Sequence, residues 1–379
     1  MPRPIHVCFP FVGDTVGGSH ISALELIKGL PQDVVEPLVV LHRDGPLVQM
    51  LRERDVTFEI APNVHLIQAG SIASQLALMA AAAPRLSGFL RSRKIAIVHT
   101  NDARMHLTWG PAARLAGAAF VWHQRSADSS RRLSLYSRLA DEVLTISQFC
   151  KSELAGSIGR RAKVVMNPFD TKREPPDRQA CRDRLVAEIG AGRQARLVGF
   201  VGNLTAQKRP LAFVEMAAQL SLSGRDLFFP MVGALRQPMQ GEVESLIGSL
   251  GLTGRCLLLG PRTPIESWIA ACDVLVAPAL HEGHGRTLIE AMLVGTPVVA
   301  MADGGHTEIV THADTGVLVK SDDELVPAVT RLLQNPEEAR AMAGRAREYA
   351  VRTYSVERHV QDIVATYKKV ADGAGKTSA

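Results

Sequence analysis

The sequence predicts an α/β protein built from two parallel-sheet domains in tandem. Short runs rich in β-branched residues alternate with helix-length amphipathic segments along most of the chain. This alternation is typical of parallel strands joined by crossover helices. A charged, proline-bearing stretch at residues 171–182, TKREPPDRQACR, interrupts the pattern, which then starts again. Since 379 residues also exceed one ordinary domain, we interpret this stretch as an interdomain linker.

The strand candidates fall into two groups, one on each side of this stretch. The first group comprises residues 5–10, 34–41, 56–60, 95–100, 118–124, 142–147 and 163–167. The second group comprises residues 195–202, 227–233, 256–260, 274–279, 296–300 and 316–319. Helical segments are expected from about Glu324 to Ala371, followed by a frayed tail. We therefore predict a first domain at 1–172, a second at 173–350 and a C-terminal segment at 351–379.

The composition indicates a soluble globular protein, with 46% hydrophobic and 21% charged residues. The five cysteines are scattered and form no C-x-x-C pair, which favours reduced thiols over a disulfide framework or a zinc ribbon. The N-terminus has no signal-peptide pattern, and the most apolar run, residues 76–84, is far shorter than the roughly 20 residues of a membrane span. We therefore expect a cytoplasmic protein.

Charge is distributed unevenly between the two halves. Residues 1–172 carry 20 Lys and Arg against 14 Asp and Glu, whereas residues 173–379 carry 23 against 24. The overall net charge of +5 is small for this length and gives no indication of nucleic-acid binding. The first half is therefore the part expected to face an anionic partner.

Residues 281–292 read HEGHGRTLIEAM and allow two interpretations. A zinc-protease helix needs two histidines four residues apart, so that both reach one metal ion, but His284 follows His281 by only three. The alternative is a strand ending near Pro278, a glycine-bearing loop and a helix from about Arg286 to Val294. We favour this second interpretation and predict no metal site.

The start of this helix predicts a binding site for phosphate. The backbone N–H groups at a helix start lack partners within the helix and attract anions. Glu282 in the loop and Glu290 on the second turn could accept hydrogen bonds from sugar or ribose hydroxyls. Taken alone, Glu290 is better explained as a solvated helix residue. The residues expected to offer N–H groups are Gly285, Arg286, Thr287 and Leu288.

The wider stretch resembles the signature of the retaining nucleotide-sugar glycosyltransferases of family four, also called glycosyl transferases group 1. The matching residues are Glu282, Gly283, Gly285, Glu290 to Met292, Gly295, Pro297 to Val299, Gly304, Gly305, Glu308, Thr315 and Gly316. The resemblance covers most of the chain and is more specific in its C-terminal half. It departs from the family at His284, where Phe is usual, and at Ala279–Leu280, where Ser commonly follows the proline. It implies the GT-B fold, with two Rossmann-like β/α/β domains facing a central cleft and a C-terminal helix crossing back to the first domain.

In the first domain, Gly17 and Gly18 lie between the first strand and a helix expected to begin near Ser19. A glycine pair lets the backbone approach a ligand closely, and a helix start favours anions. The pattern is not G-x-G-x-x-G, and the second strand ends without the acidic residue that would bind an NAD ribose, which disfavours a dehydrogenase. The resemblance implies that the pair lies beside the donor diphosphate; an ordinary strand-to-helix turn is the alternative.

Three side chains are catalytic candidates, namely His123, Glu282 and Lys208. His123 comes near the end of the strand at 118–124, where it is expected to project into the cleft. The resemblance implies a place for it near the reacting sugar, and a satisfied structural histidine is the alternative. Lys208 falls on the family lysine that neutralises the donor diphosphate, and an exposed surface lysine is the alternative.

Further donor-binding residues follow from the same resemblance. Asn203 replaces a family arginine, and either Arg209 or Arg286 could compensate for it. Three residues at strand ends lie where the family surrounds the nucleotide base, and His284 lies in the sugar-binding loop. The three strand-end residues are Gly233, Pro261 and Arg262.

The resemblance implies a reaction in which a sugar moves from a nucleoside diphosphate to a hydroxyl acceptor with retained configuration. It implies no metal and no other cofactor, and a role in the synthesis of cell-surface polysaccharide or glycolipid. Two alternatives remain open, a nucleotide-sugar epimerase of the same fold and a non-catalytic nucleotide-sugar-binding subunit. Basic residues of the first domain suggest peripheral contact with the inner face of the membrane and a lipid-linked acceptor, with a solvated surface as the alternative. These residues are Arg91, Arg93, Lys94, Arg125, Arg131, Arg132 and Arg138.

Overall fold

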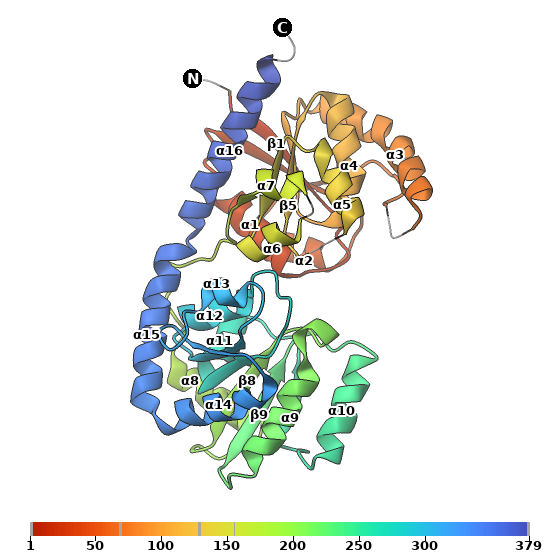
Figure 1. Cartoon of the computed structure of the whole chain (residues 1–379). Helices are drawn as coiled ribbons and strands as arrows, with labels where there is room; N and C mark the ends of the chain where they lie inside the picture. The colour runs from red at the N-terminus through yellow and green to blue at the C-terminus, as the bar shows by residue number, and fades with distance from the viewer. Residues whose placement is uncertain (1–2, 68–69, 128–129, 155, 377–379) are drawn as a thin grey trace. The chain divides into compact units, whose positions relative to one another are not determined.

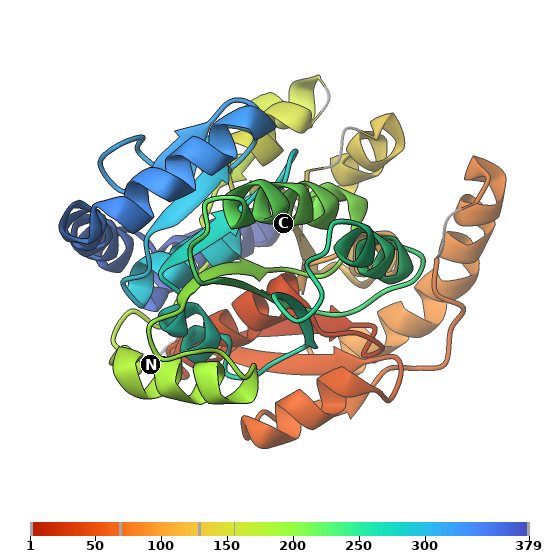
Figure 2. The ribbon, with the colours of Figure 1, turned by 90° about the horizontal axis from the view of Figure 1, so that it is seen from below.

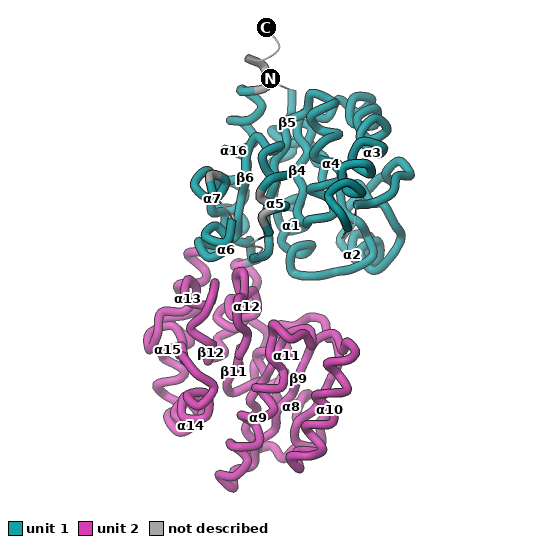
Figure 3. The backbone as a smooth tube through the Cα atoms, turned by 45° about the vertical axis from the view of Figure 1, so that its right-hand side comes forward, with its two compact units in different colours: residues 1–170, 354–379 teal, residues 171–353 magenta. Residues whose placement is uncertain are grey.

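The computed structural model describes residues 3–67, 70–127, 130–154 and 156–376. The chain forms two compact units, which Figure 3 shows in separate colours. Unit 1 contains residues 1–170 together with 354–379, and unit 2 contains residues 171–353. Each unit is an α/β layer structure with its own parallel sheet.

Unit 1 contains a parallel sheet of seven strands in the order β3-β2-β1-β4-β5-β6-β7. The strand order reverses between β1 and β4, the arrangement of doubly wound sheets, in which ligands bind beyond the carboxyl ends of the strands at this point. The strands are β1 (Ile5–Phe11), β2 (Val35–Leu41), β3 (Phe58–Ile60), β4 (Ile97–Thr100), β5 (Ala119–Gln124), β6 (Glu142–Thr145) and β7 (Lys163–Val164).

Helices cover both faces of this sheet, because alternate strand residues point to opposite sides. Figure 1 shows α3 and α4 on one side and α16 with α1 on the other. On the α16 side, Phe9 and Val121 pack in a core with Ile363 and Val370. The helices are α1 (Gly18–Gly29), α2 (Pro46–Glu53), α3 (Ile72–Ser92), α4 (Ala103–Ala116), α5 (Arg131–Tyr136), α6 (Gln148–Glu153), α7 (Ser157–Arg161) and α16 (Val356–Lys376), with a short 3₁₀ turn at Ser137–Leu139.

The last helix packs on unit 1, as the fold prediction requires. Val360, Ile363, Tyr367 and Val370 recur at helical spacing on α16 and are all buried in the core shared with β1 and α1. Gly29 at the end of α1 allows the close approach of the two helices, because a Cβ there would lie 2.7 Å from Val356 Cγ1.

Unit 2 repeats the same winding with six parallel strands in the order β10-β9-β8-β11-β12-β13. Its strands are β8 (Arg196–Val201), β9 (Leu227–Val232), β10 (Cys256–Gly260), β11 (Val274–Ala277), β12 (Val298–Met301) and β13 (Val317–Val319). All thirteen predicted strands are therefore present, with ends that differ by up to three residues from the predictions. The fold class predicted from the sequence, two parallel-sheet α/β units, is confirmed.

The helices of unit 2 also cover both faces of their sheet. Figure 2 shows α8 and α9 on opposite sides of it. The helices are α8 (Arg178–Glu188), α9 (Pro210–Ser221), α10 (Met239–Ser249), α11 (Ile265–Ala271), α12 (Arg286–Leu293), α13 (His306–Ile309), α14 (Leu325–Gln334) and α15 (Pro336–Thr353). No helix in the described parts of the chain is both long and apolar enough to cross a bilayer.

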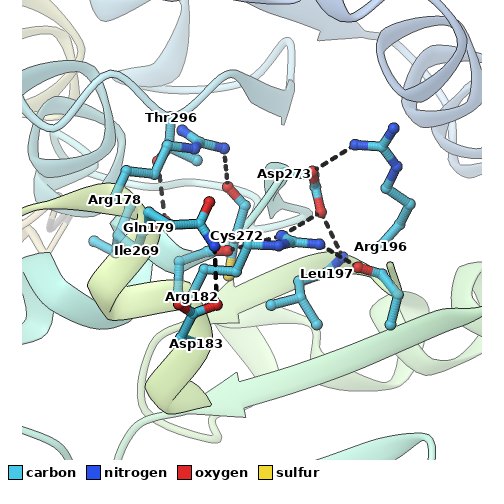
Figure 4. Close-up of polar contacts among 12 residues, drawn as sticks. Arg178, Gln179, Arg182, Asp183, Arg196, Leu197, Ile269, Cys272, Asp273 and Thr296 are labelled. Atoms are coloured by element: carbon cyan, nitrogen blue, oxygen red, sulfur yellow. Dashed lines mark hydrogen bonds and ion pairs between the residues drawn. The ribbon is translucent and has the colours of Figure 1, made fainter. Parts of the chain in front are cut away.

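The stretch at 171–182 is only in part a linker, so its interpretation from the sequence is corrected. Asp177 caps α8 by accepting hydrogen bonds from the N–H groups of Gln179 (2.8 Å) and Ala180 (3.1 Å). Two arginines on α8 then attach the helix to the sheet: Arg178 donates to the carbonyl of Cys272, and Arg182 pairs with Asp273 at 2.9 Å (Figure 4). Arg178 and Arg182, two of the charges that suggested a linker, therefore belong to the anchored face of a helix.

Candidate functional site

In unit 2, the loops that follow β8 and β11 bring Lys208 and Glu282 into direct contact. Lys208 ends a 3₁₀ turn at Ala206–Lys208, and its ammonium pairs with the Glu282 carboxylate. Their side chains are 26% and 16% exposed, so the pair is largely shielded from solvent. Attraction between opposite charges is stronger in such a shielded place than in water. Two of the three predicted catalytic side chains therefore meet, across 74 residues of sequence.

The loop before α12 requires glycine at position 285. Gly285 has φ +75°, in the left-handed region, and a Cβ there would lie 2.9 Å from the ring of His306. Because α12 begins only at Arg286, His281 and His284 do not share a helical face, and the zinc-protease interpretation has no support in the backbone.

The start of α12 offers fewer N–H groups to a ligand than the sequence suggested. The Leu288 N–H donates to the Gly285 carbonyl at 3.0 Å, so the expectation of a free N–H at this residue is wrong, and its contact with a donor stays a prediction. Thr287 and Leu288 still line the pocket described below. His284 is 3% exposed, so its side chain is buried; its role toward a donor stays a prediction.

A second cation–carboxylate pair lies on α12 itself. Arg286 and Glu290 are one helical turn apart, with 3.3 Å between Nη2 and Oε1, and their side chains are 16% and 15% exposed. Burial raises the pKa of the Glu290 carboxyl, and the neighbouring Arg286 partly opposes this shift. Glu290 is thus a shielded, paired residue, and its alternative interpretation as a solvated helix residue is wrong.

A small pocket joins these elements at the carboxyl ends of β8 and β11, the place where the strand order of unit 2 reverses. Its free volume of about 10 Å³ is far smaller than a ligand pocket of 300 to 1,000 Å³, so it is one attachment point and not a complete binding site. It is lined by Phe200, Val201, Lys208, Ala277, Pro278, Ala279, Gly285, Thr287, Leu288 and His306.

His306 in this pocket was missed by the sequence analysis. It starts α13 and is 1% exposed, and burial lowers the pKa of its ring. Its Nδ1 lies 3.2 Å from the carbonyl oxygen of Met301, so Nδ1 carries the hydrogen and Nε2 is left as an acceptor. The matched pair Gly304–Gly305 immediately before it was the only signal in the sequence.

Arg209 and Arg286, the two candidates to compensate for Asn203, have different surroundings. The Arg209 guanidinium makes a two-pronged pair with Asp322, at 2.9 and 2.5 Å, and donates to the Pro278 carbonyl. It therefore holds two loops together. Arg286, in contrast, begins α12 directly beside the pocket-lining Gly285 and Thr287.

Asn203 and Gly233 connect the loops after β8 and β9. The Asn203 side chain accepts from the Ala234 N–H at 3.1 Å. Gly233 has φ +151°, and a Cβ at this position would overlap the carbonyl oxygen of Gly202. Both residue types are thus explained by the packing of the loops, and their contacts with a donor remain predictions.

Pro261 and Arg262 follow the last residue of β10. The Arg262 guanidinium pairs with Glu188 at 2.6 Å and lies 5.0 Å from the ring centroid of Trp268. In this arrangement Arg262 helps to hold α8 and α11. A contact between either residue and a nucleotide base remains a prediction.

In unit 1, α1 begins at Gly18, one residue earlier than predicted. The Gly17 N–H donates to Nδ1 of His20 at 3.2 Å, a partner that the sequence analysis missed. A Cβ on Gly17 would meet no atom closer than 3.9 Å, so internal packing does not require glycine there. The role predicted for Gly17 and Gly18, a close approach of a ligand to the backbone, therefore stays a prediction.

His123 is fully buried in β5, in contrast to the expectation that it projects into a cleft. Its Nδ1 lies 3.2 Å from Nε2 of His99, and its ring stacks on that of His359, with 6.0 Å between centroids. Neither neighbour was identified from the sequence, because His99 and His359 come from β4 and α16 and share no motif with His123.

Two family profiles match this chain, one largely within each unit. The profile described as Glycosyl transferases group 1 matches residues 182–349, and that of Glycosyltransferase Family 4 matches residues 16–173. The chain belongs to the group 1 glycosyltransferases. The motif residues around α12 thus lie in the half that matches the group 1 profile.

Several curated relatives of this glycosyltransferase chain have names that specify a transferred sugar. This chain is 28% identical over 346 residues to the alpha-D-kanosaminyltransferase of Streptomyces kanamyceticus. The match covers 88% of this chain and 84% of the relative. The chain is 29% identical over 242 residues to the 2-deoxystreptamine glucosyltransferase of the same organism. The chain spans 62% of the length of that second relative.

Solved structures agree on the fold of the group 1 chain. HepE from Anabaena, in complex with UDP and glucose, superimposes with a TM-score of 0.82 at 23% identity, covering 96% of this chain and 99% of that one. A glycosyltransferase from Rickettsia africae gives 0.81 at 18% identity, covering 97% and 99%. The GT-B fold predicted from the sequence is confirmed.

Proposed function

We propose that the protein is a retaining glycosyltransferase that moves a sugar from a nucleoside diphosphate to a hydroxyl group of an acceptor. The observation that carries the proposal is the pairing of Lys208 with Glu282 and of Arg286 with Glu290 at one strand edge of unit 2. In each pair a shielded carboxylate holds a cation beside the start of α12. An anionic donor can take over the cations and leave the carboxylates free to bind hydroxyls.

The diphosphate is the natural partner of the two cations. The Lys208 ammonium acts as a point charge, the Arg286 guanidinium can bind two phosphate oxygens, and the first N–H groups of α12 add further donors. Because these groups offer positive charge to the leaving diphosphate, we propose that the reaction needs no metal ion and no other cofactor. We assign the compensation for Asn203 to Arg286, because Arg286 begins α12 beside the pocket-lining Gly285 and Thr287. Arg209 instead joins Asp322 to the Pro278 carbonyl.

The two carboxylates then have separate roles. Glu290 accepts hydrogen bonds from the ribose hydroxyls, and Glu282, released from Lys208, accepts from hydroxyls of the donor sugar. The acceptor hydroxyl attacks the anomeric carbon from the side on which the diphosphate leaves, and its proton passes to the leaving phosphate oxygen. This course retains the configuration and requires no covalent intermediate with the protein.

Names of relatives support the substrate class. The HepE structures are described as complexes with UDP, glucose and UDP-glucose, and curated relatives are named as glucosyl-, kanosaminyl- and mannosyltransferases. We propose a carbohydrate or lipid-linked sugar as the acceptor, in the synthesis of cell-surface polysaccharide or glycolipid, with unit 1 as the acceptor-binding part.

Contact with a membrane is a second part of this proposal. The first turns of α3 expose Ile72 (46%) and Leu76 (51%), and Arg132 of α5 donates to the Gly70 carbonyl just before them. Apolar side chains next to arginine suit an anionic bilayer surface.

Other members of the predicted basic surface are engaged within the unit, since Arg93 pairs with Glu59 and Arg125 donates to Asn101 and Asn167. Binding to vesicles with and without phosphatidylglycerol tests this; equal binding to neutral vesicles, or none to either, contradicts it.

The reaction itself is tested by release of nucleoside diphosphate from a panel of nucleotide sugars, with and without a panel of sugar and lipid-linked acceptors. Acceptor-dependent release together with a new glycosidic bond supports the transferase. Conversion of the donor sugar without an acceptor would identify an epimerase. Donor binding without any turnover would identify a non-catalytic binding subunit.

A further inference from the structure

Unit 2 has a second pocket, at the edge of its sheet opposite the pocket beside Lys208. Its lining includes Arg196, the first residue of β8, together with Asp273 and Pro297, which immediately precede β11 and β12. The pocket beside Lys208 lies instead at the carboxyl ends of β8 and β11. Because the strands of a parallel sheet all run in one direction, the two pockets lie at opposite edges and are separate.

This second pocket has the size of a ligand site. Its free volume is about 360 Å³, within the roughly 300 to 1,000 Å³ of pockets that bind small molecules. The pocket beside Lys208 has only about 10 Å³. All the lining residues of the second pocket belong to unit 2, so its shape does not depend on unit 1.

Positive charge is concentrated in this lining. Four arginines contribute to it, and among the described residues Asp273 is its one carboxylate. Figure 4 shows Asp273 with two of the arginines, Arg178 and Arg196. Asp273 pairs with Arg196 at 3.0 Å and is shared with Arg182 at 2.9 Å, so the cations outnumber the carboxylate. The four lining arginines are Arg178, Arg196, Arg340 and Arg347.

Several of these guanidiniums keep donors for a ligand. Within the described residues, Arg178 and Arg347 donate to backbone carbonyls, at 2.6 to 3.2 Å, and form no ion pair. Arg340 is exposed, and no hydrogen bond or ion pair engages it in the same part of the chain. The Arg196 side chain is 46% exposed. The charged part of the lining is therefore accessible to a ligand.

The pKa of the Arg178 guanidinium reflects this excess of positive charge. Partial burial is the main cause that lowers it, the charges of Arg182 and Arg340 lower it further, and Asp273 opposes the shift. Arginine stays protonated in spite of such a shift. The cations around this pocket thus repel one another, and a bound anion would relieve the repulsion.

Another part of the lining is apolar. It comes from the end of α14 and the first turns of α15, and it offers a surface for carbon atoms but not for charge. A ligand that uses both parts of the lining is an anion attached to a compact apolar body. The apolar lining residues are Leu332, Leu333, Pro336, Ala339 and Ala343.

We infer that this pocket binds a phosphate monoester with a compact, largely apolar organic part. Such a phosphate carries close to two negative charges at neutral pH and offers three acceptor oxygens. Arginine binds it through two parallel hydrogen bonds. A carboxylate has one charge and two oxygens, so it satisfies fewer of the available guanidiniums. The inference concerns unit 2 alone and does not rest on the proposed function.

Calorimetric titration of phenyl phosphate into the full chain tests the inference, with inorganic phosphate and benzoate as comparison ligands. Wild type should bind phenyl phosphate more tightly than the other two, because inorganic phosphate lacks the apolar part and benzoate carries only one charge. No binding of phenyl phosphate, or equal binding of inorganic phosphate, would overturn the inference. Equal or tighter binding of benzoate would overturn the assignment to a phosphate.

Arg340→Gln should weaken the binding of phenyl phosphate at least about tenfold, because it removes charge-assisted hydrogen bonds to the phosphate. Arg352→Gln is the matched control. Arg352 is an exposed arginine of the same helix that does not line the pocket, so its substitution removes the same charge. It should bind like wild type. Equal affinity in the two variants would show attraction to the general charge of unit 2 and would overturn the site.

Gly344→Leu tests the location without a change of charge. Gly344 of α15 lines the pocket, and a Cβ there meets no atom within 4 Å, so a larger side chain fits and takes up free volume. Binding of phenyl phosphate should be lost, whereas Gly248→Leu, at an equally open position of α10, should retain it. Thermal unfolding checks that both variants fold. Lys208→Gln should also retain binding; loss in Lys208→Gln with retention in Gly344→Leu would place the ligand in the other pocket and overturn the inference.

Discussion

The two units share one strand order, but their buried polar groups differ in kind. Unit 2 places two cation–carboxylate pairs, Lys208 with Glu282 and Arg286 with Glu290, at the carboxyl edge of its sheet. Unit 1 places neutral histidines near the corresponding edge of its own sheet, with His99 and His123 linked to Tyr367. The cation of a charged pair can bind an anionic ligand in place of its carboxylate, whereas a neutral imidazole ring only donates or accepts a hydrogen bond. On this difference we base the proposal that the charged part of a donor binds unit 2.

Acidification should produce the largest difference between the units. The unfolded chain binds protons at histidine below about pH 6.5, whereas the buried rings of unit 1 bind them only at lower pH, about 4 for His42 and about 3 for His359. Unit 1 should therefore lose about 1.4 kcal/mol of stability per pH unit and per such histidine as the pH falls below 6.5. In unit 2, only His306 has a clearly lowered pKa among the described residues. The unit 1 histidines with lowered pKa are His20, His42, His99, His106, His123 and His359.

Tryptophan fluorescence can follow this difference. Trp109 and Trp122 lie in unit 1 and Trp268 in unit 2, so a Trp268→Phe variant reports unit 1 alone, and its difference from wild type reports unit 2. Urea unfolding between pH 7 and 4.5 should show unit 1 weakening first and more steeply. Equal weakening of both units, or earlier loss of unit 2, would break the comparison.

Gly233→Ala should destabilise unit 2 by about 1 to 3 kcal/mol, because the alanine would occupy a backbone region that side chains rarely adopt and would overlap the Gly202 carbonyl. Gly248→Ala is the control, since it lies in α10 with no atom within 4 Å of the added Cβ, and should stabilise by about 0.5 to 1 kcal/mol. Thermal unfolding of both variants checks the pair. A neutral Gly233→Ala would show that the β8 and β9 loops are less tightly joined than described.

Glu290→Gln should weaken donor binding at least about tenfold with a smaller effect on folding. The amide keeps the shape of the side chain but replaces one accepting oxygen with a donor, so two charge-assisted hydrogen bonds to the ribose are lost. Donor titration and thermal unfolding measure the two effects. A 2′-deoxyribose donor serves as the control: wild type should discriminate against it and the variant should largely cease to. Equal discrimination by both proteins excludes the ribose contact.

Excess chelator should produce the smallest effect, namely none on turnover, because Lys208, Arg286 and the N–H groups of α12 supply the charge that a divalent ion would otherwise supply. The same assay with added manganese is the control. Loss of turnover in chelator that manganese restores would mean that the cations of unit 2 are insufficient.

The sequence predicted the layers, the glycine loop and the helix α12 because all three follow from local patterns. Strand runs, the glycine loop and the start of α12 are properties of neighbouring residues, and Glu290 and Lys208 lie in contiguous motifs. What it could not predict are contacts between distant segments. The pairing of Arg209 with Asp322 and the path from Tyr367 to His123 depend on how loops and α16 pack, over 113 and 244 residues of separation. The helix within 171–182 was also missed, because its anchoring arginines look like solvated charges.

The central claim is that the cations of unit 2 bind the diphosphate of a nucleotide sugar. Calorimetric titration of UDP-, GDP-, ADP- and dTDP-sugars into wild type and Lys208→Gln, in chelator, tests it most directly, with Lys320→Gln as a control at an exposed lysine of the same unit. The account predicts that at least one of these donors binds wild type and Lys320→Gln alike, and binds Lys208→Gln at least about tenfold more weakly. Equal binding by all three proteins, or no binding by wild type to any of these donors, would contradict it.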